Sequence, residues 1–425
     1  MVFKKLHNRA FFVLTLVLSL VSCKQQSSND TVAENMNSVE KNLKVEQTKK
    51  DIVLSNKPLA PYQDQLLDVA FEVATAIPLD PHVKDRSKMQ ELIVEASLEL
   101  EQPQRALSYT EQIKNWRRGA GYGDLALYCA KNGCGTQVQR LLELADQFSE
   151  NAEDWRRDQV RVKIARTYAW LGQKEKAEAF ESNVVESETA KVAKVDAMNA
   201  KENDFEAQVA SLDKLIGIGS FDTTKNSLHA YAELFNRFYA NAERREFVEE
   251  KIKSSWEQLP VFLRIELLLK LSDFSVDNND NAHALQLIDE AQKMFAEYEW
   301  PLEYKIKVMA GLTEARFKAG DKESAKMTAD EALTIFNTEN EKIVNIYKAG
   351  TLRPLAEAYQ VMGDTEKALT VYKEAIEKGI ENPNSRPRAE DLSSTCLSMA
   401  LHNVEPDDEL WNRIRQIKDG LSDPW

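Results

Sequence analysis

The sequence predicts an all-α protein, an α-solenoid (superhelix) of helix hairpins. From residue 57 to residue 425, apolar positions recur with helical period, and the alternating Val, Ile and Thr runs typical of strands are absent. The stretch Trp116-Arg117-Arg118 also recurs 39 residues later as Trp155-Arg156-Arg157. Repeats of this kind indicate helical units that stack because none of them can bury its apolar face alone.

The N-terminal segment, residues 1–22, has the pattern of a secretory signal. Three basic residues precede an apolar run over residues 10–21 that is too short to span a bilayer stably. The ending Leu20-Val21-Ser22-Cys23 resembles the lipobox of bacterial lipoproteins, which implies cleavage before Cys23 and lipidation of its thiol. The alternative is an ordinary cleaved signal followed by an incidental cysteine.

Residues 23–56 are polar, hold no aromatic side chain, and are expected to be a flexible tether from Cys23 to the folded part. Lys24 follows Cys23 in place of the aspartate that retains enteric lipoproteins in the inner membrane. By resemblance, this favours a lipid-anchored protein of the bacterial cell envelope, in the outer membrane.

The composition excludes several classes of partner. Residues 1–22 hold three of the 55 basic side chains and no acidic one, so the rest of the chain carries a formal charge of −17. A chain this acidic is repelled by nucleic acid, so none is expected as a partner. The five histidines are scattered away from the cysteines, so no metal site and no cofactor is expected. Cys129 and Cys134 are either bridged or two packed thiols.

The segment 355–375 identifies the kind of repeat. It reads Leu355-Ala356-x2-Tyr359-x3-Gly363-Asp364-x3-Ala368-x3-Tyr372-x2-Ala375 and resembles the tetratricopeptide pattern. Weaker copies turn on Gly133, Gly172, Asn279-Asp280 and Gly320-Asp321. The resemblance implies a TPR-like helical repeat domain over residues 57–425, in which glycine turns reverse the chain between helices.

Two parts of this domain depart from the repeat. Residues 186–258 fit worst, and two or three divergent helical pairs are expected there, with a break at Gly217-Ile218-Gly219-Ser220. Residues 406–420 are expected to form a capping helix, because Pro406 and three acidic residues favour a helix start.

Enzyme signatures are missing, so the chain is predicted not to be an enzyme. It has no G-x-S-x-G, no H-E-x-x-H and no phosphate-binding glycine loop. Carboxylates lie on many helix faces and single out no acid–base pair.

The candidate binding residues follow the Trp-Arg-Arg repeat. Arg156, Lys163, Arg166 and Trp170 fall near one stripe of a helix, while Val160, Ile164, Tyr168 and Leu171 form its core side. Arg166 and Trp170 fall at positions that line the groove in tetratricopeptide arrays. This stripe is either a contact for an acidic or extended protein segment or a solvated face.

Arg117 and Arg118 precede three alternating glycines, Gly119, Gly121 and Gly123. Each glycine costs about 1 kcal/mol in a helix interior relative to alanine. The glycines either let an anionic ligand approach the backbone beside the two arginines or let a neighbouring helix pack closely.

The expected function is that of a non-catalytic, membrane-anchored scaffold that binds another envelope protein in the groove of a TPR-like superhelix. The alternative is a glycan-binding lipoprotein of an outer-membrane uptake system, with Trp116, Trp155 and Trp170 as exposed aromatic contacts.

Overall fold

The computed structural model describes residues 52–150, 152–182 and 184–425, which form nineteen α-helices and no strand. The signal segment, Cys23 and residues 23–51 of the expected tether lie outside the described residues. Odd-numbered helices are α3 (Val83–Glu99), α5 (Arg117–Asn132), α7 (Asp154–Trp170), α9 (Glu186–Asn199), α11 (Phe221–Arg237), α13 (Val261–Asp277), α15 (Leu302–Lys318), α17 (Asn345–Val361) and α19 (Ser385–Leu401). Even-numbered helices are α2 (Pro61–Ala76), α4 (Pro103–Thr110), α6 (Val138–Glu150), α8 (Lys174–Glu181), α10 (Phe205–Ile216), α12 (Ala242–Ser255), α14 (Asn281–Ala296), α16 (Lys322–Glu339), α18 (Thr365–Gly379) and α20 (Asp408–Asp419).

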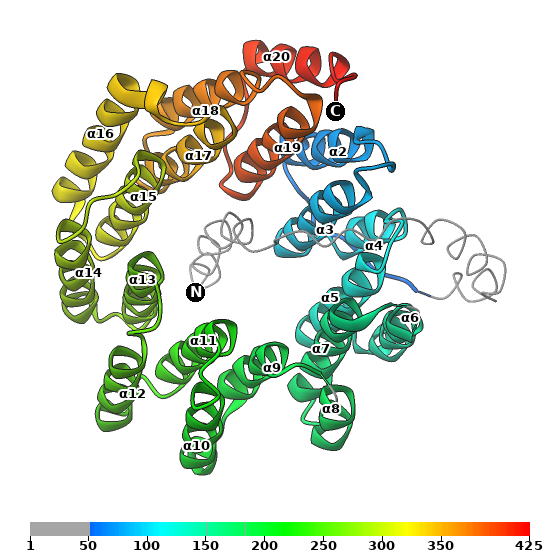
Figure 1. Cartoon of the computed structure of the whole chain (residues 1–425), viewed down its shortest axis with the longest axis vertical. Coiled ribbons are helices and arrows are strands. Elements are labelled where there is room, and N and C mark those ends of the chain that lie inside the picture. Colours follow the sequence, from blue (N-terminus) through cyan, green and yellow to red (C-terminus); the bar gives the residue numbers. More distant parts are fainter. Residues whose placement is uncertain (1–51, 151, 183) are drawn as a thin grey trace.

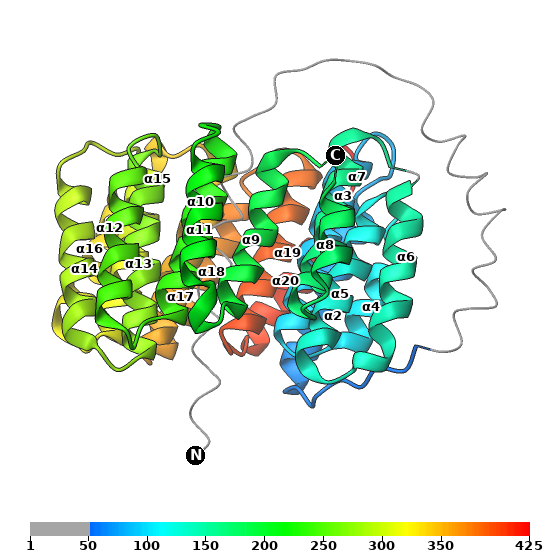
Figure 2. The same cartoon turned by 90° about the horizontal axis from the view of Figure 1, so that it is seen from below.

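The helices form a ring of two concentric layers (Figure 1). Each odd-numbered helix from α3 to α17 packs against the next odd-numbered helix, and together they form the inner layer. Each also packs against the even-numbered helix that follows it, and these lie in the outer layer. Viewed from the side, the helices run roughly along the axis of the ring (Figure 2).

The two ends of the chain close the ring. Helix α19 packs against both α2 and α3, so α2 takes the place of an outer partner for the last inner helix. The Gln63 amide donates to the carbonyl of Ala400 (2.8 Å), and the Ser393 hydroxyl donates to the carbonyl of Ala70 (3.0 Å). These contacts join segments more than 300 residues apart in sequence.

The turns between paired helices follow the sequence pattern. Gly133, Gly172, Gly320 and Gly363 all have positive φ, between 71° and 97°, in the region that ends a helix and favours glycine. At two of them an aspartate follows and caps the next helix: Asp321 accepts from the Ser324 amide, and Asp364 from the Lys367 amide, both at 3.2 Å. Asn279 supplies the same backbone conformation with φ 62°. The predicted turns are therefore found at these positions.

Burial differs between the layers because an inner helix is covered on more sides. Helix α13 buries residues around most of its circumference, whereas α16 buries a single stripe, Ala325, Ala329, Ala332 and Phe336. Alanines on such stripes let the paired helices approach closely, as Ala356, Ala368 and Ala375 do between α17 and α18. The apolar core therefore runs between the two layers and around the ring.

In the part that fits the repeat worst, four helices (α9 to α12) form two pairs, and Gly219 ends the first pair with φ 76°. Helix α20 begins after Asp407, whose carboxylate accepts from the Leu410 amide (2.9 Å). It bridges two outer helices, because Arg413 pairs with Glu377 of α18 (2.6 Å) and Lys418 with Glu72 of α2 (2.7 Å). Residues 52–60 precede α2 without helix, and Leu54 among them is buried.

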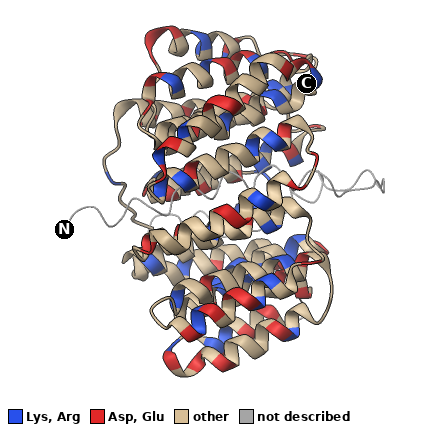
Figure 3. Cartoon of the chain, turned by 90° about the vertical axis from the view of Figure 1, so that its left-hand side faces the viewer, with Lys and Arg blue, Asp and Glu red and all other residues tan. Residues whose placement is uncertain are grey.

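Charged side chains of both signs are interspersed along the helices seen from the side that carries α14 (Figure 3). None of the helices in the described part of the chain is both long and apolar enough to cross a membrane. Cys129 and Cys134 form a disulfide at the end of α5.

Candidate functional site

Arg166 and Trp170 lie on the side of α7 that faces away from its outer partner. Arg161 donates to the carbonyl of Phe180 in α8 (3.0 Å), and Tyr168 stacks on the Phe180 ring. Arg166 and Trp170 are about half a helical turn from Arg161, at about 100° per residue. This places both side chains on the inner wall of the ring, as the groove positions of the sequence pattern predicted.

The other residues of the predicted stripe do not join them in one exposed surface. Arg156 lies over the ring of Trp155 (5.6 Å), which is 47 % exposed at the start of α7. Trp155 in turn meets Trp116 edge to face, with centroids 5.5 Å apart. Leu171, expected on the core side, is exposed.

Arg117 and Arg118 diverge although they are adjacent in sequence. The Arg117 guanidinium pairs with Glu91 of α3 and lies over Trp116 (4.6 Å). The Arg118 guanidinium lies over Phe148 of the outer helix α6 (5.4 Å). They therefore form no common anion site beside the glycines.

The three alternating glycines serve helix packing. A Cβ at Gly119 would lie 2.5 Å from Phe148 Cβ, one at Gly121 would lie 2.7 Å from Thr110 Oγ1, and one at Gly123 would lie 2.8 Å from Lys163 Cβ. All three glycines are buried within α5. Of the two interpretations of this stretch, the structure supports close helix contact.

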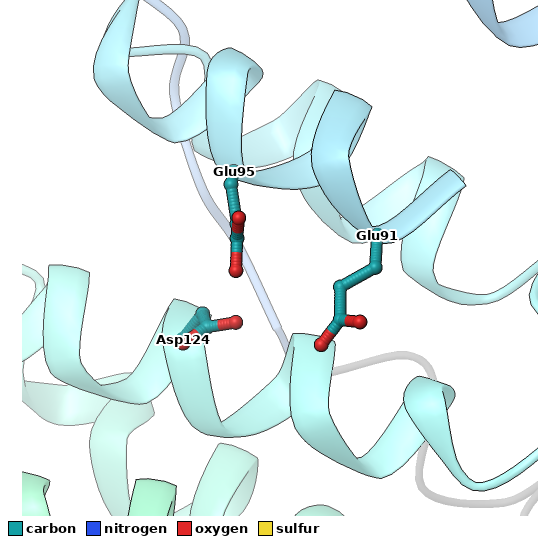
Figure 4. A group of neighbouring side chains, drawn as sticks. All are labelled: Glu91, Glu95 and Asp124. Atoms are coloured by element: carbon teal, nitrogen blue, oxygen red, sulfur yellow. The ribbon is translucent and has the colours of Figure 1, made fainter. Parts of the chain in front are cut away.

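Lys163 is held by carboxylates on two neighbouring helices. Its Nζ lies 2.5 Å from Asp124 of α5, and 3.3 Å and 3.5 Å from Glu91 and Glu95 of α3. Figure 4 shows how the three carboxylates converge. Such a cluster could hold a metal ion, but the Lys163 ammonium already supplies the cation among these oxygens.

The electrostatics of this cluster follow from its burial. Burial opposes ionisation of Glu91, but Lys163 and Arg117 outweigh it and hold the pKa of that carboxyl below its usual range. Burial raises the pKa of Glu95 to about 7, with Asp124 and Glu91 adding repulsion. The three carboxylates overcome the burial of Lys163 and raise its pKa.

Ion pairs of this kind recur around the inner wall and join neighbouring inner helices. Each connects a basic side chain of one helix to an acidic side chain of the next. The pairs are Asp124–Lys163 (2.5 Å), Lys194–Glu233 (3.4 Å), Glu233–Lys270 (2.8 Å), Asp273–Lys318 (3.4 Å) and Arg353–Asp391 (3.0 Å).

A second group of basic side chains on the inner wall outnumbers the acidic side chains that pair with it. We use the name cationic arc for the inner-wall side chains Lys131, Arg166, Lys194, Lys225, His229 and Lys270, which come from α5, α7, α9, α11 and α13. Glu233 pairs with two of its lysines. Among the described residues, no ion pair or hydrogen bond engages Lys131, Arg166 or Lys225, and Arg166 Nε is buried without an acceptor. Lys131 lies over the Trp170 ring, 4.5 Å from its centroid.

The pKa values in the arc record an excess of positive charge. Lys270, followed by burial, lowers the pKa of Lys194 to about 8, and Arg166 adds to this effect. Burial together with Lys270, Lys194 and Lys225 lowers the pKa of His229 well below its ordinary value. A bound anion would relieve this repulsion.

Sequence reasoning found Arg166 of the arc, and Trp170 near it, but missed the other members of the arc. One signal was present, because Lys194 and Glu233 are one 39-residue repeat apart, like Asp124 and Lys163. Lys225, His229 and Glu233 also follow each other at four-residue spacing on one helix face.

The opposite part of the inner wall is apolar. A pocket of about 1160 Å³, part of it open to solvent, is lined by α13, α15, α17, α19 and α3. We call it the apolar pocket. Its wall includes Leu92, Phe262, Leu269, Val308, Leu397 and Leu401.

No protein-family model matches this chain, and no curated protein matches its sequence.

Proposed function

We propose that this chain is a lipid-anchored protein of the bacterial cell envelope, and that its inner wall binds an acidic, extended segment of another envelope protein without catalysing a reaction. On this proposal the hairpins are TPR-like, and the superhelix they form is closed into a ring. The cationic arc carries the proposal, because no ion pair or hydrogen bond engages Lys131, Arg166 or Lys225 among the described residues. The carboxylates of Asp124 and Glu266 act on Arg166 and Lys225 without pairing with them.

The charge of the whole chain makes this arc selective. The chain carries a formal charge of −14, so an acidic partner is repelled by most of the surface and attracted only at the arc. Exposed ion pairs contribute only about 0–1 kcal/mol each, so charge mainly steers and orients the partner. Trp170 supplies an aromatic anchor beside Arg166, and anchors of this type carry much of the energy of an interface.

Binding of a glycan remains the second candidate. The exposed face of Trp155 favours it, since sugars stack on open aromatic rings. Trp116 meets Trp155 by its edge, and Lys131 covers Trp170, so the three rings do not form one stacking platform.

The experiment that tests the protein-binding proposal is site-specific photo-crosslinking in intact cells. A photoreactive residue replaces Met198, which lies one turn after Lys194 on α9, or, as the control, the exposed Met327 of outer helix α16. We expect a crosslinked envelope protein at Met198 and none at Met327, and loss of the product in an Arg166→Gln, Lys194→Gln double variant. Equal crosslinking at both positions, or crosslinking to saccharide alone, would contradict the proposal.

The anchor is tested separately. Cys23→Ser should move the protein from the membrane fraction to the soluble fraction, because among the described helices none can cross a membrane. A variant that still sediments with membranes after a high-salt wash would contradict lipidation of Cys23.

A further inference from the structure

Lys307 is a buried lysine that lines the apolar pocket. Among the described residues, no acidic side chain forms an ion pair with it. It lies on α15, is 8 % exposed and lines the pocket. Within the described part of the chain, no hydrogen bond or ion pair engages its ammonium, whose contact is the Tyr304 ring at 5.9 Å. The neighbouring guanidinium of Arg353 is engaged by Asp391 (3.0 Å).

Other buried lysines of this protein show what Lys307 lacks. Lys270 pairs with Glu233 at 2.8 Å, Lys318 with Glu314 at 2.6 Å, and Lys348 with Glu381 at 2.8 Å. A buried charge without a partner is costly, and proteins normally avoid it. Burial and the nearby Arg353 accordingly lower the pKa of Lys307 to about 8, although Glu303 and Asp391 act in the opposite direction.

The walls around Lys307 select the rest of the ligand. They are helices whose main-chain groups bond within the helix, so they leave no row of backbone donors and acceptors for a peptide strand. The lining combines apolar side chains, among them four leucines, Ile265, Val308 and Phe262, with charged ones, which include Glu95 and Glu99 of α3. Glu266 of α13 also lines the pocket, is 3 % exposed, and has an Oε2 atom without a donor. Together with Glu95 and Glu99, its carboxylate disfavours a ligand with more than one negative charge.

We propose that the apolar pocket binds a free long-chain fatty acid, with the carboxylate on Lys307 and the acyl chain along the walls of α13, α17, α19 and α3. A carboxylate would complete the one missing pair on Lys307 as a charge-assisted hydrogen bond. The acyl chain would cover apolar surface that otherwise faces water, and this burial favours binding. The pocket is partly open to solvent, which gives a linear chain a way into it.

Equilibrium dialysis of the full-length protein in detergent-free buffer tests the proposal. The probes are radiolabelled palmitate and hexadecanol, kept below the concentrations at which they aggregate. We expect saturable palmitate binding, and Lys307→Met should weaken palmitate at least tenfold while changing hexadecanol less than threefold. Lys326→Met, on an exposed site of outer helix α16, is the matched control and should leave both unchanged.

A second variant separates a lost site from a lost fold. Ser394 lines the pocket, is half-buried and has no hydrogen bond among the described contacts, so Ser394→Trp should fill the pocket with little change to the core. We expect it to abolish binding of both probes while the circular dichroism melt stays unchanged. Palmitate that binds equally to wild type, Lys307→Met and Ser394→Trp, or no saturable binding at all, would overturn the proposal.

Crosslinking with a photoreactive palmitate, followed by identification of the modified peptides, tests the proposal on the wild-type protein without any variant. We expect adducts on peptides of α13, α15, α17, α19 or α3. Adducts confined to outer helices would overturn the proposal. Capture at the cationic arc should be unchanged in Lys307→Met, so failure of the fatty-acid site and failure of the proposed function are distinguishable.

Discussion

Lys163 and Asp124 occupy equivalent positions in successive hairpins, and their side chains meet 2.5 Å apart on the inner wall. The 39 residues between them equal the spacing of the two Trp-Arg-Arg stretches. The pair therefore joins the two copies of this repeat, and two carboxylates of α3 extend it to a third helix.

Removal of Lys163 should destabilise the protein strongly. Lys163→Met leaves three carboxylates close together with Arg117, on Glu91, as the remaining cation, and breaking a buried pair typically costs about 3–5 kcal/mol. Urea unfolding at pH 7.5 measures the loss, with Lys326→Met as an exposed control. The loss should shrink at pH 5, because the carboxylates then take up protons. An equal loss at both pH values would contradict this account.

Glu95 should make stability depend on pH in the opposite sense to an ordinary paired carboxylate. Its pKa is raised from 4.5 to about 7, so the folded state holds this proton more tightly than the unfolded state. The resulting stability is fully present below pH 4.5 and is lost as the pH rises to about 7. Glu95→Gln should remove this dependence and raise the free energy of unfolding above that of wild type at pH 8, on the order of 3 kcal/mol. Thermal melts from pH 4.5 to 8 check it, and a steeper loss in the variant would refute it.

The glycines of α5 should tolerate no added methyl group. Gly119→Ala would place Cβ 2.5 Å from Phe148 Cβ, and overpacking typically costs about 1–3 kcal/mol, more than the ~1 kcal/mol that alanine gains in a helix. Gly135→Ala is the control, because no atom lies within 4 Å of its added Cβ. Chemical denaturation of both variants should show a net loss only for Gly119→Ala.

Local patterns explain why much of the fold could be predicted. Gly320 and Gly363 stand where the chain must take positive φ, and the aspartates after them cap the next helix, so the turns depend on a few neighbouring residues. Closure of the ring depends on Gln63 reaching Ala400, a contact that no local pattern encodes. The cationic arc is likewise assembled from five helices, and Arg166 is the member whose position the repeat could assign.

Because the ring is closed, we expect hydrogen exchange to rise together in two segments that are far apart in the sequence. Ala70→Trp would force a large ring between α2 and α19, where the Ser393 hydroxyl reaches the Ala70 carbonyl. Hydrogen exchange should rise in residues 61–76 and also in residues 385–401, at the other end of the sequence. Residues 221–277, on the opposite side of the ring in Figure 1, should stay protected. Faster exchange restricted to residues 61–76 would indicate an open array.

The last prediction separates the roles of Trp170 and Arg166 in partner capture. Trp170 is half-buried with Lys131 over its ring, whereas Arg166 contributes a charge without an acidic partner among the described residues. Trp170→Ala should therefore weaken capture of the crosslinked partner more than Arg166→Ala, because an aromatic anchor buries apolar area and a partly solvated charge does not. Raising the salt from 0.05 to 0.5 M (about a threefold shorter screening length) should blunt the arginine effect and leave the tryptophan effect. Both variants should keep the wild-type circular dichroism melt. If Trp170→Ala lowers the melting temperature as much as it lowers capture, Trp170 belongs to the core, and the anchor of the arc must be sought among its other side chains.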